Sequence, residues 1–199
     1  EQRRVFFDVI EKLSEADIFI PYLHTANSAA TLLYGNQLGN LVRPGKAIYG
    51  NYPSASVARE CKKQNIVLKP ILSLKTKVVH IKDLPKGTGI SYGSTFVTKQ
   101  KTKVAVLPIG YYDGYDRKLS NSAEVLIKGK RCKILGRICM NMFMVDISRV
   151  KGVKIEDEAV LIGRQGKEEI TADELARKIG TINYEVVTRL RESMERKIV

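Results

Sequence analysis

The stretch LSLKTKV at residues 72–78 marks a change from one hydrophobic pattern to another. On an extended backbone, Leu74 and Val78 face one way, and Lys75 and Lys77 face the other. This period of two is typical of a strand with one buried face and one face exposed to solvent. The sequence therefore predicts a region rich in β structure from this stretch onward.

The residues that follow continue the β pattern. Short apolar runs predict strands at residues 103–109, 124–127, 132–135, 143–147 and 159–162. Turn-forming residues, each with a glycine, separate the runs at residues 86–87, 113–114 and 128–129.

One helix is predicted among these strands. Thr171 and Glu174 have the spacing of a capping box, in which each side chain bonds the backbone of the other residue. Leu175 and Ile179 give the helix an apolar stripe, and Gly180 is a typical left-handed stop.

The start of the chain has a different pattern. Val5, Val9 and Leu13 recur at helical spacing, and residues 17–21 are typical of a turn that leads into a short buried strand. A helix that feeds a strand is therefore expected here.

Helices and short strands alternate further along. Helices are expected at residues 28–33 and 54–64, with a second short strand within residues 41–49. This alternation favours part of a parallel α/β layer. We expect the chain to divide near residue 66, with residues 1–66 in one part and residues 67–199 in the other.

Composition narrows the class of protein. The 199 residues are 44% hydrophobic, which is enough to form a core. No run approaches the roughly 18 apolar residues of a membrane span. The three cysteines are odd in number and have neither disulfide nor zinc spacing. Together these features predict a soluble cytoplasmic protein with no metal and no membrane contact.

The net charge of +13 is concentrated in one part of the chain. Residues 58–106 carry eleven lysines and arginines against Glu60 and Asp83. Such a density could follow the phosphates of a nucleic acid, or form a solvated face whose acidic complement lies elsewhere. Since no aromatic residue interleaves with the lysines before Tyr92, we favour the solvated face and expect no nucleic-acid partner.

Six motifs follow one another along the chain: HTANS (24–28), RPGKAIYG (43–50), ISYG (90–93), GYYDGY (110–115), GRICMN (136–141) and TINYEV (181–186). Their order and spacing resemble the alanine racemase family, fold type III enzymes that depend on pyridoxal 5'-phosphate (PLP). The resemblance implies an α/β plus β fold, with the last strands of a TIM (β/α)8 barrel in residues 1–66 and a mainly antiparallel β-domain in residues 67–199. The PLP-bearing lysine of the family lies near the start of a much longer chain, so this chain resembles the second half of an enzyme.

The resemblance implies that Tyr92, in ISYG, is a catalytic base. Racemisation removes the α-proton from one face of an amino acid and returns a proton to the other face. The PLP lysine, absent here, would serve one face, and Tyr92 would serve the other in the active site of the opposite subunit of a homodimer. A tyrosine has an ordinary pKa of about 10, so Tyr92 needs nearby positive charge to act as a base near neutrality.

The resemblance also assigns residues to PLP. Arg43 would face the pyridine nitrogen, and His24 would support Arg43 by a hydrogen bond. An arginine stays protonated and gives that nitrogen no proton, which favours simple proton exchange over transamination.

The PLP phosphate would be held by four further residues. Ser28 and Tyr184 would contribute their hydroxyl groups, and Gly45 and Lys46 their backbone groups. Lys46 departs from the family pattern, in which this position is usually apolar. Its side chain must therefore leave a packed site or touch the phosphate.

Four residues are expected near the substrate. Met140 would bind the substrate carboxylate through its backbone, with Cys139 and Asn141 at neighbouring pocket positions. Asn141 stands where many relatives have aspartate. Tyr111 would lie at the mouth of the substrate channel, although an aromatic residue beside an Asp-Gly turn is about as well explained by the turn itself.

The resemblance implies that the chain is a portion of an alanine racemase, which interconverts L- and D-alanine and supplies D-alanine for peptidoglycan. It would act on a small amino acid, would need a missing N-terminal barrel segment, and would be inactive alone. Three alternatives remain at this stage. One is a serine-preferring racemase of the same family, another is a non-catalytic oligomerisation module, and the third is a basic β-barrel that binds nucleic acid.

Overall fold

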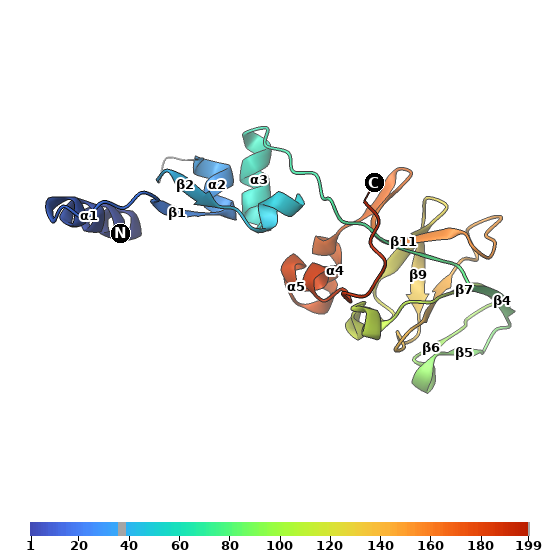
Figure 1. Ribbon diagram of the computed structural model, residues 1–199. Helices are drawn as coiled ribbons and strands as arrows, with labels where there is room; N and C mark the ends of the chain where they lie inside the picture. The colour runs from blue at the N-terminus through green and yellow to red at the C-terminus, as the bar shows by residue number, and fades with distance from the viewer. Residues whose placement is uncertain (36–38, 199) are drawn as a thin grey trace. The chain divides into compact units, whose positions relative to one another are not determined.

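The computed structural model describes residues 1–35 and 39–198, which form two compact units. The first unit is Glu1–Ile71, and the second begins at Leu72 and runs to the end of the chain. Figure 1 shows the elements of each unit. The boundary between the units follows Ile71, whereas the hydrophobic pattern of the sequence predicted a boundary near residue 66. Within the described ranges, no helix has the length and apolar character needed to cross a bilayer.

The first unit alternates helices with two short parallel strands. Its elements are α1 (Gln2–Glu15), β1 (His24–Asn27), α2 (Ser28–Tyr34), β2 (Leu41–Arg43), the 3₁₀ helix η1 (Lys46–Tyr49) and α3 (Ala55–Lys63). Strand β1 pairs in parallel with β2, so that Asn27 lies opposite Arg43. The predicted helices and the parallel α/β arrangement of this part are confirmed.

One prediction for the first unit was wrong. Ile18, Phe19 and Ile20 were expected in a short buried strand, but they form no strand and are 50%, 86% and 40% exposed. An apolar run becomes a buried strand only where neighbouring strands and a second layer cover it. No strand in the described part of the chain pairs with these residues.

The second unit is built around an antiparallel sheet of eight strands among the described residues. The strand order is β12-β11-β8-β9-β10-β7-β4, and β3 also pairs with β11. The strands are β3 (Leu74–Lys77), β4 (His80–Leu84), β7 (Thr102–Leu107), β8 (Glu124–Ile127), β9 (Lys130–Leu135), β10 (Phe143–Asp146), β11 (Glu158–Gln165) and β12 (Glu168–Ile170). The predicted antiparallel β region is therefore confirmed.

Shorter elements lie between and after these strands. They are β5 (Gly89–Ile90), η2 (Tyr92–Ser94), β6 (Phe96–Val97), η3 (Tyr111–Asp113), η4 (Arg117–Leu119), α4 (Ala172–Ile179) and α5 (Asn183–Thr188). Strands β5 and β6 pair with each other and form a separate two-stranded ribbon. Helix α5 and strands β4, β5, β6 and β12 were not predicted from the sequence.

The hydrophobic core belongs to the second unit. Leu107, Val125, Phe143 and Leu161 are fully buried in one cluster, together with Leu175 of α4. In the first unit, over the described residues 1–35 and 39–71, the buried apolar residues are Ala26 and Cys61. Burial of apolar side chains is the main favourable term in folding, so the second unit has a core of its own and the first unit has little.

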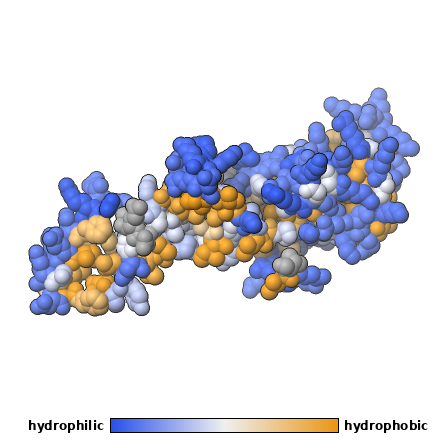
Figure 2. Space-filling model, turned by 90° about the horizontal axis from the view of Figure 1, so that it is seen from above, coloured by the Kyte–Doolittle hydropathy of each residue, from blue (hydrophilic) through white to orange (hydrophobic). Residues whose placement is uncertain are grey.

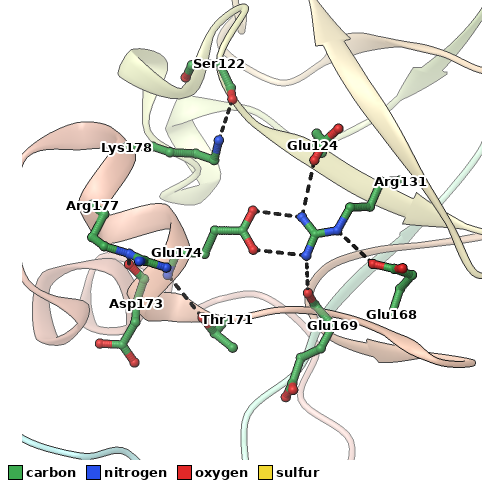
Figure 3. A network of polar contacts seen from close by, with 10 residues as sticks. All are labelled: Ser122, Glu124, Arg131, Glu168, Glu169, Thr171, Asp173, Glu174, Arg177 and Lys178. Carbon is green, nitrogen blue, oxygen red and sulfur yellow. Dashed lines mark hydrogen bonds and ion pairs between the residues drawn. The ribbon is translucent and has the colours of Figure 1, made fainter. Parts of the chain in front are cut away.

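An arginine joins α4 to the sheet (Figure 3). Arg131 on β9 donates to both carboxylate oxygens of Glu174, at 2.9 and 3.2 Å, and to Glu168 at 2.8 Å. It also donates to Glu124 at 3.3 Å and to the Glu169 carbonyl. The hydrogen bonds to Glu174, and next to Glu168, raise the pKa of the Arg131 guanidinium further above its usual value.

This network changes the predicted capping box of α4. The Thr171 hydroxyl accepts from the Glu174 backbone N–H at 3.1 Å, as the motif predicts. The Glu174 side chain, however, binds Arg131. A hydrogen bond between two charged groups is about twice as strong as a neutral one, which explains why the carboxylate prefers the guanidinium to a backbone N–H.

Part of the basic stretch is neutralised within the chain. Lys63 pairs with Glu60 at 2.9 Å, Lys75 with Glu158 at 3.0 Å, and Lys77 with Glu156 at 2.6 Å. The first of these pairs lies in the first unit and the other two lie in the second. The stretch is therefore divided between two units and contains some of its own counter-charge.

Candidate active site

Tyr92 lies on a tight loop that a neighbouring loop holds in place. It begins η2, one residue after strand β5, and is 74% exposed. The preceding residue, Ser91, has a φ of 63°, and its hydroxyl donates to the Arg137 carbonyl at 2.7 Å. The same Ser91 oxygen lies 3.4 Å from the Cys139 sulfur. The ISYG loop is thereby fixed to the GRICMN loop.

The approach of these two loops depends on a glycine. Gly136 has a φ of 77°, and a Cβ at this position would lie 2.6 Å from the Ile90 carbonyl oxygen and 2.9 Å from the Ser91 Cβ. A side chain here would meet both a strained backbone conformation and a direct clash. Glycine therefore lets the backbone of GRICMN pack against the residues just before Tyr92.

The GYYDGY loop joins the same assembly. The Tyr111 N–H donates to the Cys139 carbonyl at 3.1 Å, and the Tyr112 N–H donates to the Met140 carbonyl at 2.9 Å. Three motifs that are separate in the sequence, at residues 90–93, 110–115 and 136–141, are thus brought to one place on the second unit. Tyr92, Tyr111, Cys139, Met140 and Asn141 all lie on these three loops.

Two further polar residues support the loops, and the motifs gave no sign of them. Asn121 accepts from the Gly136 N–H at 2.6 Å and donates to the Thr95 hydroxyl at 3.2 Å. The Ser120 hydroxyl accepts from the Ile138 N–H at 3.0 Å. Both residues lie in the turn before β8 and satisfy backbone donors of the GRICMN loop, which leaves that loop little freedom to move.

The motif loops expose large apolar and aromatic side chains. Tyr92, Tyr111, Tyr112, Met140 and Met142 are 74%, 43%, 59%, 55% and 44% exposed. A rigid part of a protein with a well-formed core seldom leaves such a group in water unless another molecule covers it. The loops therefore have the character of a binding surface.

Tyr184 lies on α5 and not in the unit that contains the other residues assigned to the phosphate. It belongs to the second unit, whereas Ser28, Gly45 and Lys46 belong to the first. The residues after α5 contact the GYYDGY loop, since the Arg191 N–H donates to the Asp113 carbonyl at 3.2 Å. A joint role of Tyr184 and Ser28 stays a prediction.

The first unit places a small group of donors at the carboxyl ends of its parallel strands. The Ser28 hydroxyl oxygen accepts from the backbone N–H groups of Gly45 at 2.9 Å and Ala47 at 3.4 Å. Ser28 follows β1, and Gly45 lies between β2 and η1. The carboxyl edge of a parallel sheet is a common site for ligands of α/β proteins.

The Ser28 hydroxyl can donate to an anionic group such as the PLP phosphate, since a hydroxyl donates one hydrogen bond while its oxygen accepts others. The N–H groups of Gly45 and Ala47 are occupied here by the Ser28 oxygen, so they would reach a phosphate only after leaving it. The space where Gly45 would carry a side chain is open, with no atom within 4 Å of the Cβ position. Ser28 and Lys46 are 7% and 6% exposed, whereas Gly45 between them in this corner is exposed to solvent.

Arg43 and His24 are both exposed and lie at opposite ends of the strand pair. Arg43 ends β2 opposite Asn27, whereas His24 begins β1 opposite Leu41. Over the residues that the structure describes, no hydrogen bond joins His24 to Arg43. Their predicted cooperation at the pyridine nitrogen therefore stays a prediction.

The described residues also contain no cluster of acidic, histidine or cysteine side chains able to hold a metal ion.

Comparison with known protein families identifies both units. Residues 71–198 match the family model of the alanine racemase C-terminal domain. The matched residues include the whole second unit except its last residue. The chain belongs to the alanine racemase family. Residues 1–53 match the model of the alanine racemase N-terminal domain, so each unit corresponds to one part of an alanine racemase.

Individual alanine racemases match nearly the full length of the chain. Alanine racemase of Halothermothrix orenii is 44% identical over 197 residues, which is 99% of this chain and 51% of that protein. Alanine racemase of Carboxydothermus hydrogenoformans is 48% identical over 182 residues, 92% of this chain and 48% of that protein. The chain spans about half the length of the curated relatives it matches.

Solved alanine racemase structures have the same fold over this half. The enzyme from Bacillus anthracis with bound L-Ala-P aligns with a TM-score of 0.84 and 42% identity, over 96% of this chain and 48% of that one. The enzyme of Clostridium difficile 630 in complex with cycloserine aligns with a TM-score of 0.86 and 39% identity, over the same shares of the two chains.

Proposed function

We propose that this chain is the carboxyl-terminal half of an alanine racemase and that it interconverts L- and D-alanine when joined to the half that carries the PLP lysine. The carrying observation is that hydrogen bonds join ISYG, GYYDGY and GRICMN, far apart in the sequence, into one surface that includes Tyr92. The family match over residues 71–198 supports the same conclusion. In a cell-wall-forming bacterium, the D-alanine would enter peptidoglycan.

In this proposal the two units have separate tasks. Residues 1–66 form the last strands and helices of a PLP-binding TIM barrel, and residues 67–199 form the β-domain that carries Tyr92. Ser28 and the backbone of Gly45 and Lys46 hold the phosphate of PLP, with Tyr184 as a further hydroxyl donor. When bound, PLP withdraws electrons from the α-carbon of the amino acid and so makes the α-proton acidic.

The chain's own residues then move and orient the proton. Tyr92 removes or returns the α-proton on one face, and the lysine of the other half serves the second face. Met140 binds the substrate carboxylate through its backbone, with Cys139 and Asn141 beside it and Tyr111 at the mouth of the channel. Arg43, supported by His24, faces the pyridine nitrogen without giving it a proton.

The partners follow from the exposed surfaces. The high exposure of Tyr92, Tyr111 and Met140 supports a homodimer in which Tyr92 enters the active site of the other subunit. Helix α1 has no buried residue, and Figure 2 shows apolar side chains on its surface. We infer that the preceding barrel segment covers this helix and supplies the core that the first unit lacks.

Co-expression with the missing half tests the proposal. The chain would be produced together with the amino-terminal half of the Halothermothrix orenii enzyme, which supplies the PLP lysine, and D-alanine formation from L-alanine would be followed with PLP present. We expect no activity from the chain alone and clear activity from the pair. Serine supplied as the second substrate should react more slowly than alanine.

Two tyrosine variants complete the design. Tyr92→Phe should reduce racemisation by at least about a hundredfold, the factor that a general base typically contributes. Tyr34→Phe is the matched control, since this tyrosine is exposed on α2 and belongs to none of the motifs. An inactive pair whose halves fold and associate would refute the racemase and favour an oligomerisation module.

A further inference from the structure

A short segment after α5 lies along the GYYDGY loop. The guanidinium carbon of Arg191 is 4.4 Å from the centroid of the Tyr112 ring. Its Nη1 atom lies 3.7 Å from a carboxylate oxygen of Asp113, and its backbone N–H donates to the Asp113 carbonyl at 3.2 Å. One residue of the carboxyl-terminal segment therefore contacts two consecutive residues of the loop.

Arg189 adds a second attachment. Its guanidinium pairs with Asp116 at 3.0 Å and with Glu185 of α5 at 3.2 Å. Gly114 has a φ of 91°, and a Cβ at this position would lie 2.1 Å from the Arg189 carbonyl oxygen. The two backbones are thus in direct contact. We refer to residues 189–191 as the strap.

The GYYDGY loop also contacts the GRICMN loop, which carries Met140. The N–H groups of Tyr111 and Tyr112 donate to the carbonyls of Cys139 and Met140. The loop is therefore held by both the strap and the GRICMN loop. If the loop moved away from the strap, these two hydrogen bonds would weaken, and Met140 and Tyr111 would lose their fixed positions.

We propose that Arg191 is a positioning residue of the racemase, which acts through Tyr112 to hold Tyr111 and Met140 in place for the substrate. The inference rests on the proposed function, because it assigns these residues to the substrate channel. Arg191 itself contacts the loop and not the reacting atoms. Its planar, permanently charged guanidinium can stack on the face of an aromatic ring. At an exposed site, such a cation–π contact typically changes the equilibrium constant between the closed and open states by a factor of about two to five.

Hydrogen exchange of the 199-residue chain tests the strap without any need for activity. Arg191→Met keeps the backbone N–H bond to Asp113 and removes only the charged, planar head group. The amides of Tyr111 and Tyr112 should then exchange about two to five times faster. Those of β8 (Glu124–Ile127) should not change, because this strand lies in the core.

Three further variants show whether the guanidinium is the cause. Arg191→Lys should restore part of the protection, since it keeps the charge but not the planar group. Arg196→Met should have no effect, since this arginine is exposed and makes no ion pair with a described residue. Tyr112→Leu should mimic Arg191→Met, and the double variant should exchange little faster than either single variant.

Kinetics of the co-expressed pair test the effect on the substrate. Arg191→Met should raise KM for alanine about two- to fivefold and leave kcat within about twofold. Unchanged exchange at Tyr111 and Tyr112 would overturn the strap. Faster exchange with unchanged KM would overturn the positioning role and leave a purely structural contact.

The same experiments separate this inference from the proposed function. If the unmodified pair is folded but inactive, the racemase assignment fails, and the effect of Arg191 on a substrate fails with it. Faster exchange in Arg191→Met would in that case still show that the strap fixes the loop. If the unmodified pair is active, the KM of the Arg191→Met pair decides the positioning role by itself.

Discussion

Alanine at position 136 should destabilise the second unit more than alanine at position 152. The two glycines have similar backbone conformations, with φ angles of 77° and 68°. A Cβ on Gly136 would lie 2.6 Å from the Ile90 carbonyl oxygen, whereas a Cβ on Gly152 would have no atom within 4 Å. Comparison of the two variants therefore separates backbone strain from the close approach of the loops.

The expected losses follow from these two contributions. A left-handed conformation costs an alanine about 1–2 kcal/mol, and this applies to both positions. Forcing a methyl group against packed backbone adds about 1–3 kcal/mol at Gly136 alone. Gly152→Ala should thus lower the free energy of unfolding by about 1–2 kcal/mol, and Gly136→Ala by about 2–5 kcal/mol.

Urea unfolding followed by far-ultraviolet circular dichroism gives both numbers, since the chain has no tryptophan to report by fluorescence. The transition of the second unit should move to lower urea with an unchanged slope, which indicates a loss of stability and not a change in compactness. Equal losses in the two variants would mean that the close approach of Gly136 to Ile90 adds nothing to the cost of a side chain at position 136.

Three further predictions concern polar and thiol groups of the second unit and of α3. Arg131→Met should lower the free energy of unfolding by about 1–2 kcal/mol, since it leaves Glu124, Glu168 and Glu174 close together without their shared cation, whereas Arg149→Met at an exposed position should have little effect in the same urea assay. The Lys154 N–H, and then Lys128, hold the pKa of Asp157 below its usual value. The stability from Asp157 is therefore present above its unfolded-state pKa of about 4 and is lost as the pH falls through the lower folded value. The difference in melting temperature between the natural protein and Asp157→Asn should shrink below about pH 4. A constant difference from pH 7 to pH 2 would contradict this prediction. Burial raises the pKa of the Cys132 thiol to about 12 and raises that of Cys61, so a thiol reagent at pH 8 should modify half-buried Cys139 first, and Cys139→Ser should abolish the fast phase.

Strands with a strong apolar pattern could be predicted from the sequence. Residues 125–127 are an uninterrupted buried run of β8, and α4 has both its cap at Thr171 and its stop at Gly180. Strand β4 was missed because the consecutive charged residues Lys82 and Asp83 break the alternation of apolar and polar residues. This strand lies at an edge of the sheet, where charged side chains are common. Helix α5 was missed because residues 186–188 are Val, Val and Thr, which favour strands.

The site could be predicted in part. The motifs indicated Tyr92, Tyr111 and Met140, and the structure places them on adjoining loops. Asn121 could not be predicted from the sequence, because it supports the site by accepting a hydrogen bond from the Gly136 N–H, which is distant in the chain. The partner of Glu174 was also missed for this reason, because Arg131 comes beside α4 only in the folded sheet.

The most direct test of the account is solvent deuterium exchange at the α-carbon of alanine by the co-expressed pair carrying Tyr92→Phe. In the proposed mechanism, loss of one of the two bases leaves proton exchange on the face served by the lysine but no delivery of a proton to the other face. We predict that one enantiomer of alanine gains deuterium without inversion while racemisation falls by at least about a hundredfold. Racemisation at the rate of the unmodified pair would contradict the assignment of Tyr92 as a base.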